Sequence, residues 1–187
     1  WVGHLLARIL TIHDAAFAGA FDRNRLETLG ISQSGLTMDG VEFYGRLSFL
    51  KAGISYCSHV TTVSATYANE ITTPEFGCGL DGLLRLRAQE GRLTGIINGI
   101  DTDWNPRRDP HLDCHFDAGE SKSRQANAEV VRQAFGLAAS RGPLFAVISR
   151  LVHQKGVDLT IQATETIVRQ GGQIVVTGRG DARLEIE

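Results

Sequence analysis

The sequence predicts an α/β protein that contains parts of two domains built on parallel sheets and that is incomplete at both ends. Two short apolar runs, 143–149 and 173–178, flank a segment with helical spacing of its apolar residues. A strand–helix–strand order within about 35 residues is typical of a parallel sheet with a right-handed crossover. The first two thirds of the chain repeat this order less regularly. A chain that begins at Trp1 and stops soon after a strand and a Gly-rich turn is expected to be a segment of a longer protein.

The first part of the chain predicts three strands that alternate with helices. The expected strands are 8–13, 59–64 and 93–98, and the expected helices are 47–57, 64–71 and 81–90. Each strand ends in a polar or Gly-containing turn. Open α/β sheets bind ligands beyond the carboxyl ends of their strands, so these turns are where functional residues are expected.

The second part begins with a polar stretch, 105–121, that reads as a surface connection, followed by a helix over 123–137. Residues 143–149 predict a strand buried on both faces. A helix over 158–170 then ends at Gly171 and Gly172, which are C-terminal stop signals, before a second strand. We therefore assign residues 1–140 to a first domain with its connection and residues 141–187 to the start of a second.

The composition excludes several classes of protein. The chain has 187 residues, 42% hydrophobic and 21% charged, as is usual for a globular protein. A formal net charge of −2 gives no basis for nucleic-acid or anionic-membrane binding, and no apolar run approaches the ~20 residues of a membrane span. The three cysteines are odd in number and far apart, and no signal peptide is recognisable, which indicates a reducing compartment, the cytoplasm.

Arg150 and Lys155 lie between the strand 143–149 and the following helix. On a helix, residues five apart would diverge, so a shared target requires a loop. Such a loop directs backbone N–H groups and the positive end of the helix dipole outward. A bidentate Arg and a compact Lys together suit a phosphate group. The alternative is a pair of solvated surface cations.

Two further candidates follow expected strands of the first part. His13 ends the strand 8–13 and precedes Asp14, but neighbouring residues on a strand point to opposite sides, so the alternative to a catalytic pair is a structural histidine. Asn98 and Gly99 predict a turn after the strand 93–98. The Asn98 amide could bind a sugar hydroxyl, and the alternative is a plain Asn-Gly turn.

The turn GRGD, 178–181, supplies Gly178 and Asp181 as candidate substrate-binding residues, although it lacks the third glycine and the helix of a dinucleotide fingerprint. His111, Cys114 and His115 cluster in the polar connection. No second pair of ligands stands at a zinc-like spacing, so we expect no metal site there.

The chain resembles the bacterial glycogen synthases and plant starch synthases that use ADP-glucose. The resemblance rests on several blocks that occur in the family's order, and together they are far more specific than any one. They are TIHDAAFAG (11–19), DGVEFYGRLSFLKAGISYCSHVTTVSATYANEI (39–71), EFGCGLDGLL (75–84), IINGIDTDWNP (96–106), PLFAVISRLVHQKGVDL (143–159) and VVTGRGD (175–181).

The resemblance implies a retaining glucosyltransferase with two Rossmann-like domains of the GT-B type and a substrate cleft between them. It would transfer glucose from ADP-glucose to the non-reducing end of an α-1,4-glucan without a cofactor or metal ion. Arg150 and Lys155 match the family's residues for the donor diphosphate, where they would stabilise the departing ADP. His13 matches a sugar-binding histidine, and Asn98 matches the Asn of the NG[IV]D turn on the sugar side of the cleft.

The sequence also departs from the family pattern. Asp14 stands where Asn is usual and places a carboxylate near the substrate site, Ala65 replaces a proline, and Arg179 stands where a small residue is common. The block NGIDTDWNP is one residue short, which would shift Trp104. The family's Lys-Thr-Gly-Gly-Leu and Glu-Pro-x-Cys-Gly-Leu blocks are expected upstream and downstream of this chain.

Two alternatives to the glycogen synthase hypothesis stay open. The chain by itself is expected to be inactive, and it could be a truncated remnant that binds nucleotide or glucan weakly. It could also belong to another GT-B glycosyltransferase that uses UDP-glucose.

Overall fold

The structure is a computed structural model that describes residues 6–186. The chain divides into two compact units, one up to Ile100 and one from Asp101 onward, and each is described by itself. Residues 101–140 therefore pack with the second unit. The assignment of residues 1–140 and 141–187 to two domains of a larger protein stays a prediction. No helix in the described part of the chain has the length and apolar character that a membrane crossing requires.

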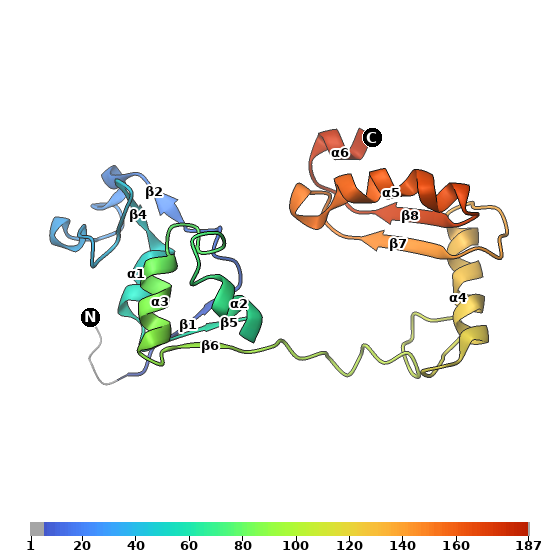
Figure 1. The fold of residues 1–187 in the computed structure, drawn as a ribbon, viewed down its shortest axis with the longest axis horizontal. Coiled ribbons are helices and arrows are strands. Elements are labelled where there is room, and N and C mark those ends of the chain that lie inside the picture. The colour runs from blue at the N-terminus through green and yellow to red at the C-terminus, as the bar shows by residue number, and fades with distance from the viewer. Residues whose placement is uncertain (1–5, 187) are drawn as a thin grey trace. The chain divides into compact units, whose positions relative to one another are not determined.

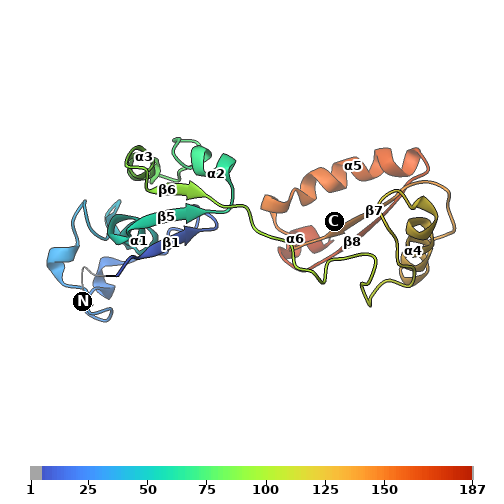
Figure 2. The ribbon, with the colours of Figure 1, turned by 90° about the horizontal axis from the view of Figure 1, so that it is seen from below.

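A three-stranded parallel sheet forms the centre of the first unit (Figure 2). The central strand pairs with a neighbour on each side, in the order β1-β5-β6. The three strands correspond to the three that the sequence predicts, each somewhat shorter: β1 (Ile9–Ile12), β5 (His59–Thr62) and β6 (Leu93–Gly95).

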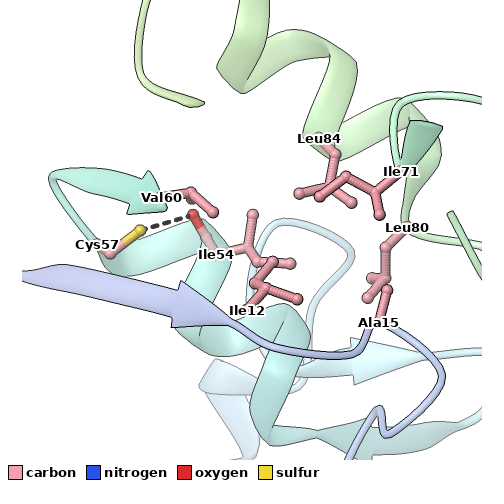
Figure 3. Packing of buried hydrophobic residues seen from close by; sticks show 8 residues of the cluster. All are labelled: Ile12, Ala15, Ile54, Cys57, Val60, Ile71, Leu80 and Leu84. Carbon is pink, nitrogen blue, oxygen red and sulfur yellow. Dashed lines mark hydrogen bonds between the residues drawn. The ribbon is translucent and has the colours of Figure 1, made fainter. Parts of the chain in front are cut away.

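Three helices follow the predicted helical segments and pack with this sheet. They are α1 (Phe49–Tyr56), α2 (Ala65–Glu70) and α3 (Asp81–Gln89). Apolar side chains from the sheet, from α1 and α3 and from the segments around them meet in one core (Figure 3). That core consists of Ile12, Ala15, Ile54, Cys57, Val60, Ile71, Leu80 and Leu84.

The chain between β1 and β5 forms a small antiparallel sheet, which the sequence did not predict. Its strands are β2 (Ala20–Phe21), β3 (Glu42–Phe43) and β4 (Arg46–Ser48), in the order β2-β4-β3. Strands of two or three residues are too short for a periodic pattern. β4 also takes the first residues of the predicted helix 47–57. Helix α1 begins at Phe49 because the Ser48 hydroxyl caps it by accepting a hydrogen bond from the Lys51 N–H.

Two arginines close the C-terminal end of α1. The largely buried Arg87 of α3 donates to the carbonyls of Ile54 (3.1 Å) and Ser55 (2.6 Å). Arg92 donates to the carbonyl of Ser58 at 2.7 Å, and Glu90 accepts from both guanidinium groups. Cations suit the negative end of a helix dipole, so this arrangement fixes α1 against α3.

The second unit contains the predicted strand–helix–strand unit and the predicted preceding helix. Strands β7 (Leu144–Ile148) and β8 (Gln173–Thr177) pair in parallel, and α5 (Val157–Arg169) lies along them (Figure 1). Helix α4 (Ser121–Ala134) precedes β7, a 3₁₀ turn, η3 (His153–Lys155), precedes α5, and α6 (Ala182–Ile186) follows β8. Arg132 attaches α4 to this sheet, because its guanidinium donates to the Gln173 side chain at 2.6 Å and to the Gly142 carbonyl at 2.8 Å.

The prediction that the strand 143–149 is buried on both faces is wrong for the described chain. Ile148 is 80% exposed, and Phe145 and Val176 are exposed by more than two fifths. The reason is that only two strands form this sheet and α5 lies along one side of it, while Val175 and Val157 are buried there.

Candidate functional site

The loops after β7 and β8 form the site that contains the two predicted cations. Figure 1 shows that the turn η3 and helix α6 both lie beyond the carboxyl ends of these strands. Backbone hydrogen bonds continue the strand pairing into the loops: the N–H of Leu151 donates to the Arg179 carbonyl at 3.0 Å, and the N–H of Asp181 donates to the Leu151 carbonyl at 2.7 Å. The two loops are therefore held as one rigid element.

Two glycines allow this close approach. A Cβ atom on Gly178 would lie 1.8 Å from the Ser149 carbonyl oxygen, and one on Gly180 would lie 2.1 Å from that of Leu151. Real Cβ atoms do not approach backbone oxygens so closely. The Gly-x-Gly spacing of the GRGD turn thus serves the packing of one loop on the other.

Arg150 and Lys155 both lie on this element and are exposed. Lys155 is the last residue of η3, and Gly156, with φ +67°, reverses the chain into α5. Within residues 6–186 neither side chain has an ion pair or a hydrogen bond. The predicted loop between strand and helix is confirmed, and its two cations are free to bind an anion.

The start of α5 adds a positive partial charge near these cations. Its N-cap is Gly156, which has no side chain to accept a hydrogen bond from the first turn. Asp158 of that turn lies 3.6 Å from the His153 ring nitrogen, so this carboxylate is directed toward η3. The uncapped N–H groups and the helix dipole favour an anion at this end.

Asp181, a predicted substrate-binding residue, takes part in local structure. Its carboxylate accepts a hydrogen bond from the Arg183 N–H at 3.0 Å and so caps α6. Its backbone N–H donates a hydrogen bond to the Leu151 carbonyl, as described above. The roles of Asp181 and Gly178 toward a substrate stay predictions.

His13 and Asp14 follow β1 at the carboxyl edge of the parallel sheet in the first unit. The loop is fixed to α2, because the Ala15 N–H donates to the Tyr67 hydroxyl at 2.9 Å. The Asp14 carboxylate accepts from the Ala16 N–H at 2.9 Å, a local turn that an Asn side chain could form equally well. His13 is exposed.

Asn98 lies beyond β6 at the same edge of the sheet and is exposed. The predicted Asn98-Gly99 turn is wrong, since residues 96–100 form neither a turn nor a strand. Because β5 separates β1 from β6, the strands that lead to His13 and Asn98 are about 10 Å apart. The fold thus brings both residues to one edge without placing them in contact.

The polar connection is ordered by local contacts. The Asn127 side chain of α4 accepts from the Cys114 N–H at 3.1 Å and donates to its carbonyl at 2.7 Å. Arg107 forms an ion pair with Asp117, which lowers the pKa of that carboxyl group below its usual value. In the described part of the chain, no three His, Cys, Asp or Glu side chains are grouped so that they could hold a metal ion.

Sequence reasoning identified the cations of the loop after β7 but not the pairing of that loop with the GRGD turn. The two glycines that flank Arg179 in the sequence could have indicated this pairing. The pairing places Arg179 in the same rigid element as Arg150.

Comparison with known proteins identifies relatives over almost the whole chain. The family model of the starch synthase catalytic domain matches residues 4–86. Glycogen synthase 1 of Bradyrhizobium diazoefficiens is 55% identical over 185 residues, which are 99% of this chain and 40% of that protein. Glycogen synthase of Pseudomonas syringae pv. syringae is 54% identical over 99% of this chain and 38% of its own length.

A solved structure has the same fold. It is the catalytic domain of starch synthase IV from Arabidopsis thaliana bound to ADP and acarbose, with a TM-score of 0.85 and 34% identity. The match covers 94% of this chain and 36% of that one. The chain therefore has the GT-B type of α/β fold over the part it spans, which is about two fifths of the length of the curated relatives above.

Proposed function

The chain belongs to the family of glycogen and starch synthases, and we propose that its protein transfers glucose from ADP-glucose to the non-reducing end of an α-1,4-glucan with retention of configuration. Identity of 55% to a glycogen synthase over 99% of the chain supports this activity. The relative bound to ADP supports a nucleotide diphosphate as part of the donor. No membrane-spanning helix is found among residues 6–186, and we propose a cytoplasmic location.

The observation that carries the proposal is the rigid pair of loops after β7 and β8. It presents Arg150 and Lys155 to solvent with no anionic partner in the described chain, beside the uncapped start of α5. A diphosphate supplies the two negative groups that such a loop lacks. In this proposal, residues 141–187 contribute to the nucleotide-sugar domain and residues 1–140 to the acceptor-side domain with its connection.

The reaction breaks the bond between C1 of the donor glucose and an oxygen of the diphosphate. ADP leaves with the electron pair of that bond, C1 bonds to a hydroxyl oxygen at the glucan end, and the proton of that hydroxyl is released. Negative charge on the diphosphate grows as the bond lengthens. Arg150 and Lys155 therefore bind the transition state more strongly than the ground state.

We propose that His13 and Asn98 bind sugar hydroxyls from the carboxyl edge of the first unit's sheet. Both are exposed, and both carry groups that donate and accept hydrogen bonds. Asp14 has its carboxylate in a local turn, so its effect on the donor is indirect and acts through the position of His13.

The test is release of ADP by the natural protein that contains this chain, in the presence of glycogen and ADP-glucose. We expect ADP in proportion to glucose added to the glycogen. A protein that is folded but releases no ADP would contradict the proposal. Competition with UDP-glucose addresses the second donor: strong competition and equal turnover would favour the alternative glycosyltransferase. The same assay on residues 1–187 alone tests whether this segment is active by itself: ADP release would support catalysis, whereas no release from a folded segment would favour the truncated remnant.

A further inference from the structure

We propose that Arg179 is a third diphosphate-binding cation, which acts together with Arg150 and Lys155. This inference rests on the proposed function, because it concerns the same anion. It starts from the register of β7 and β8, in which Ile148 is paired with Thr177. The bridge between Leu151 and Gly180 has the same offset along the two chains.

Continuing this register through the intervening residues places Arg150 opposite Arg179. The Ser149 N–H donates to the Thr177 carbonyl at 3.2 Å, and the Leu151 N–H donates to the Arg179 carbonyl at 3.0 Å, so the pairing is continuous on both sides of Arg150. Neighbouring strands lie about 4.8 Å apart, and residues paired in parallel project to the same side. The backbone positions of two arginines therefore lie side by side.

Like charges placed directly opposite each other are destabilising, and a nearby carboxylate would relieve the repulsion. None does so in the described residues. The Asp181 carboxylate caps α6, Glu185 accepts from the Gly180 N–H at 2.8 Å, and Asp158 faces His153. No ion pair or hydrogen bond of the Arg179 side chain is present within residues 6–186, and the residue is exposed.

A bound dianion resolves this repulsion. Two adjacent guanidinium groups offer planar pairs of N–H donors that match phosphate oxygens, and Lys155 adds a point charge across the loop. The backbone at Arg179 cannot move aside, since Gly178 and Gly180 pack against the carbonyls of Ser149 and Leu151. Arg179 thus adds affinity for the phosphates of the donor and product and not for the glucan.

The experiment measures binding of ADP, inorganic pyrophosphate and AMP to the natural protein by calorimetry. We expect Arg179→Ala to weaken the binding of ADP and of pyrophosphate by about tenfold, or about 1.4 kcal/mol, and the binding of AMP by less. The affinities of Arg179→Lys should lie between those of the wild type and Arg179→Ala. The wild-type protein should also lose more ADP affinity with added salt than the variant does.

Arg169→Ala is the matched control. This arginine is exposed and pairs with Glu165 at the far end of α5, roughly 18 Å along the helix from its start. Its removal changes the net charge equally and should leave ADP binding unchanged. If Arg179→Ala binds ADP like the wild type while Lys155→Ala is weakened, the role of Arg179 is wrong and the proposed function stands. If the folded wild type binds neither ADP nor pyrophosphate, both are wrong.

Discussion

Replacement of Gly180 by alanine tests whether the paired loops create the proposed nucleotide site. Gly180 lies opposite Leu151, and an added Cβ would meet the oxygen, carbon and nitrogen of that backbone at 2.1, 2.6 and 2.8 Å. All three contacts are shorter than real Cβ atoms tolerate, and none is with a flexible side chain. The two loops must therefore separate.

The expected loss follows from the bonds that separation breaks. The Leu151 N–H loses the Arg179 carbonyl, and the Asp181 N–H loses the Leu151 carbonyl. Each backbone hydrogen bond contributes about 1 kcal/mol net, so the free energy of unfolding of this unit should fall by about 2 kcal/mol. Because the same bonds hold Arg150 in place, we also expect ADP affinity to fall by about tenfold or more.

Urea unfolding followed by circular dichroism and ADP titration measure the two effects. Gly82→Ala in the first turn of α3 is the matched control, because a Cβ there meets no atom within 4 Å and alanine is preferred to glycine in a helix. That variant should be more stable by roughly 0.5–1 kcal/mol and bind ADP normally. A Gly180→Ala variant with wild-type stability and wild-type ADP affinity would refute the argument.

Three other changes have defined outcomes. Lys155→Ala should lower turnover on the order of a hundredfold through lost stabilisation of the departing ADP, and steady-state kinetics that match the wild type would contradict its role. Arg87→Leu should reduce the free energy of unfolding by about 2–3 kcal/mol, because two carbonyls at the end of α1 lose their donor, whereas the exposed Arg85→Leu should cost less than half as much. The hydrogen-bonded guanidinium of Arg107 holds the pKa of the Asp117 carboxyl group below its usual value. This ion pair therefore stabilises the folded state above the usual pKa of the carboxyl group, and that stabilisation is lost as the pH falls through the folded pKa. Asp117→Asn should make acid unfolding less steep, and an unchanged profile would exclude this contribution.

Much of the fold could be predicted because its longer elements have strong patterns. Three local signals were sufficient to place the ends of the strand–helix–strand unit within one or two residues. They are the apolar runs of β7 and β8, the helical spacing of apolar residues in α5, and the glycines Gly171 and Gly172 that end this helix. The loop with Arg150 and Lys155 followed directly from that unit. The order of β1, β5 and β6 could not be obtained in the same way, since pairing partners far apart in sequence leave no local pattern.

The missed features depend on contacts between distant segments. The strands β2, β3 and β4 are held by pairing and by Lys51, whose ammonium donates to the Glu42 carbonyl at 2.6 Å. The exposure of Ile148 depends on how many strands flank β7, which a run of apolar residues does not specify. Arg179 was visible as an unusual residue between two glycines. Its place opposite Arg150 required the register of the two loops.

The magnitude expected for Lys155 depends on the environment in which the site works. A hundredfold effect on turnover corresponds to about 2.7 kcal/mol. Two unit charges 4 Å apart interact by about 1 kcal/mol in bulk water and about 4 kcal/mol at an effective dielectric constant of 20. Lys155, Arg150 and Arg179 are all exposed on the second unit. The full effect therefore requires that substrate and surrounding protein exclude water from the paired loops during the reaction. Added salt distinguishes a site closed to water from a site open to it. The effect of Lys155→Ala on turnover should persist at high ionic strength in a closed site and shrink in an open one.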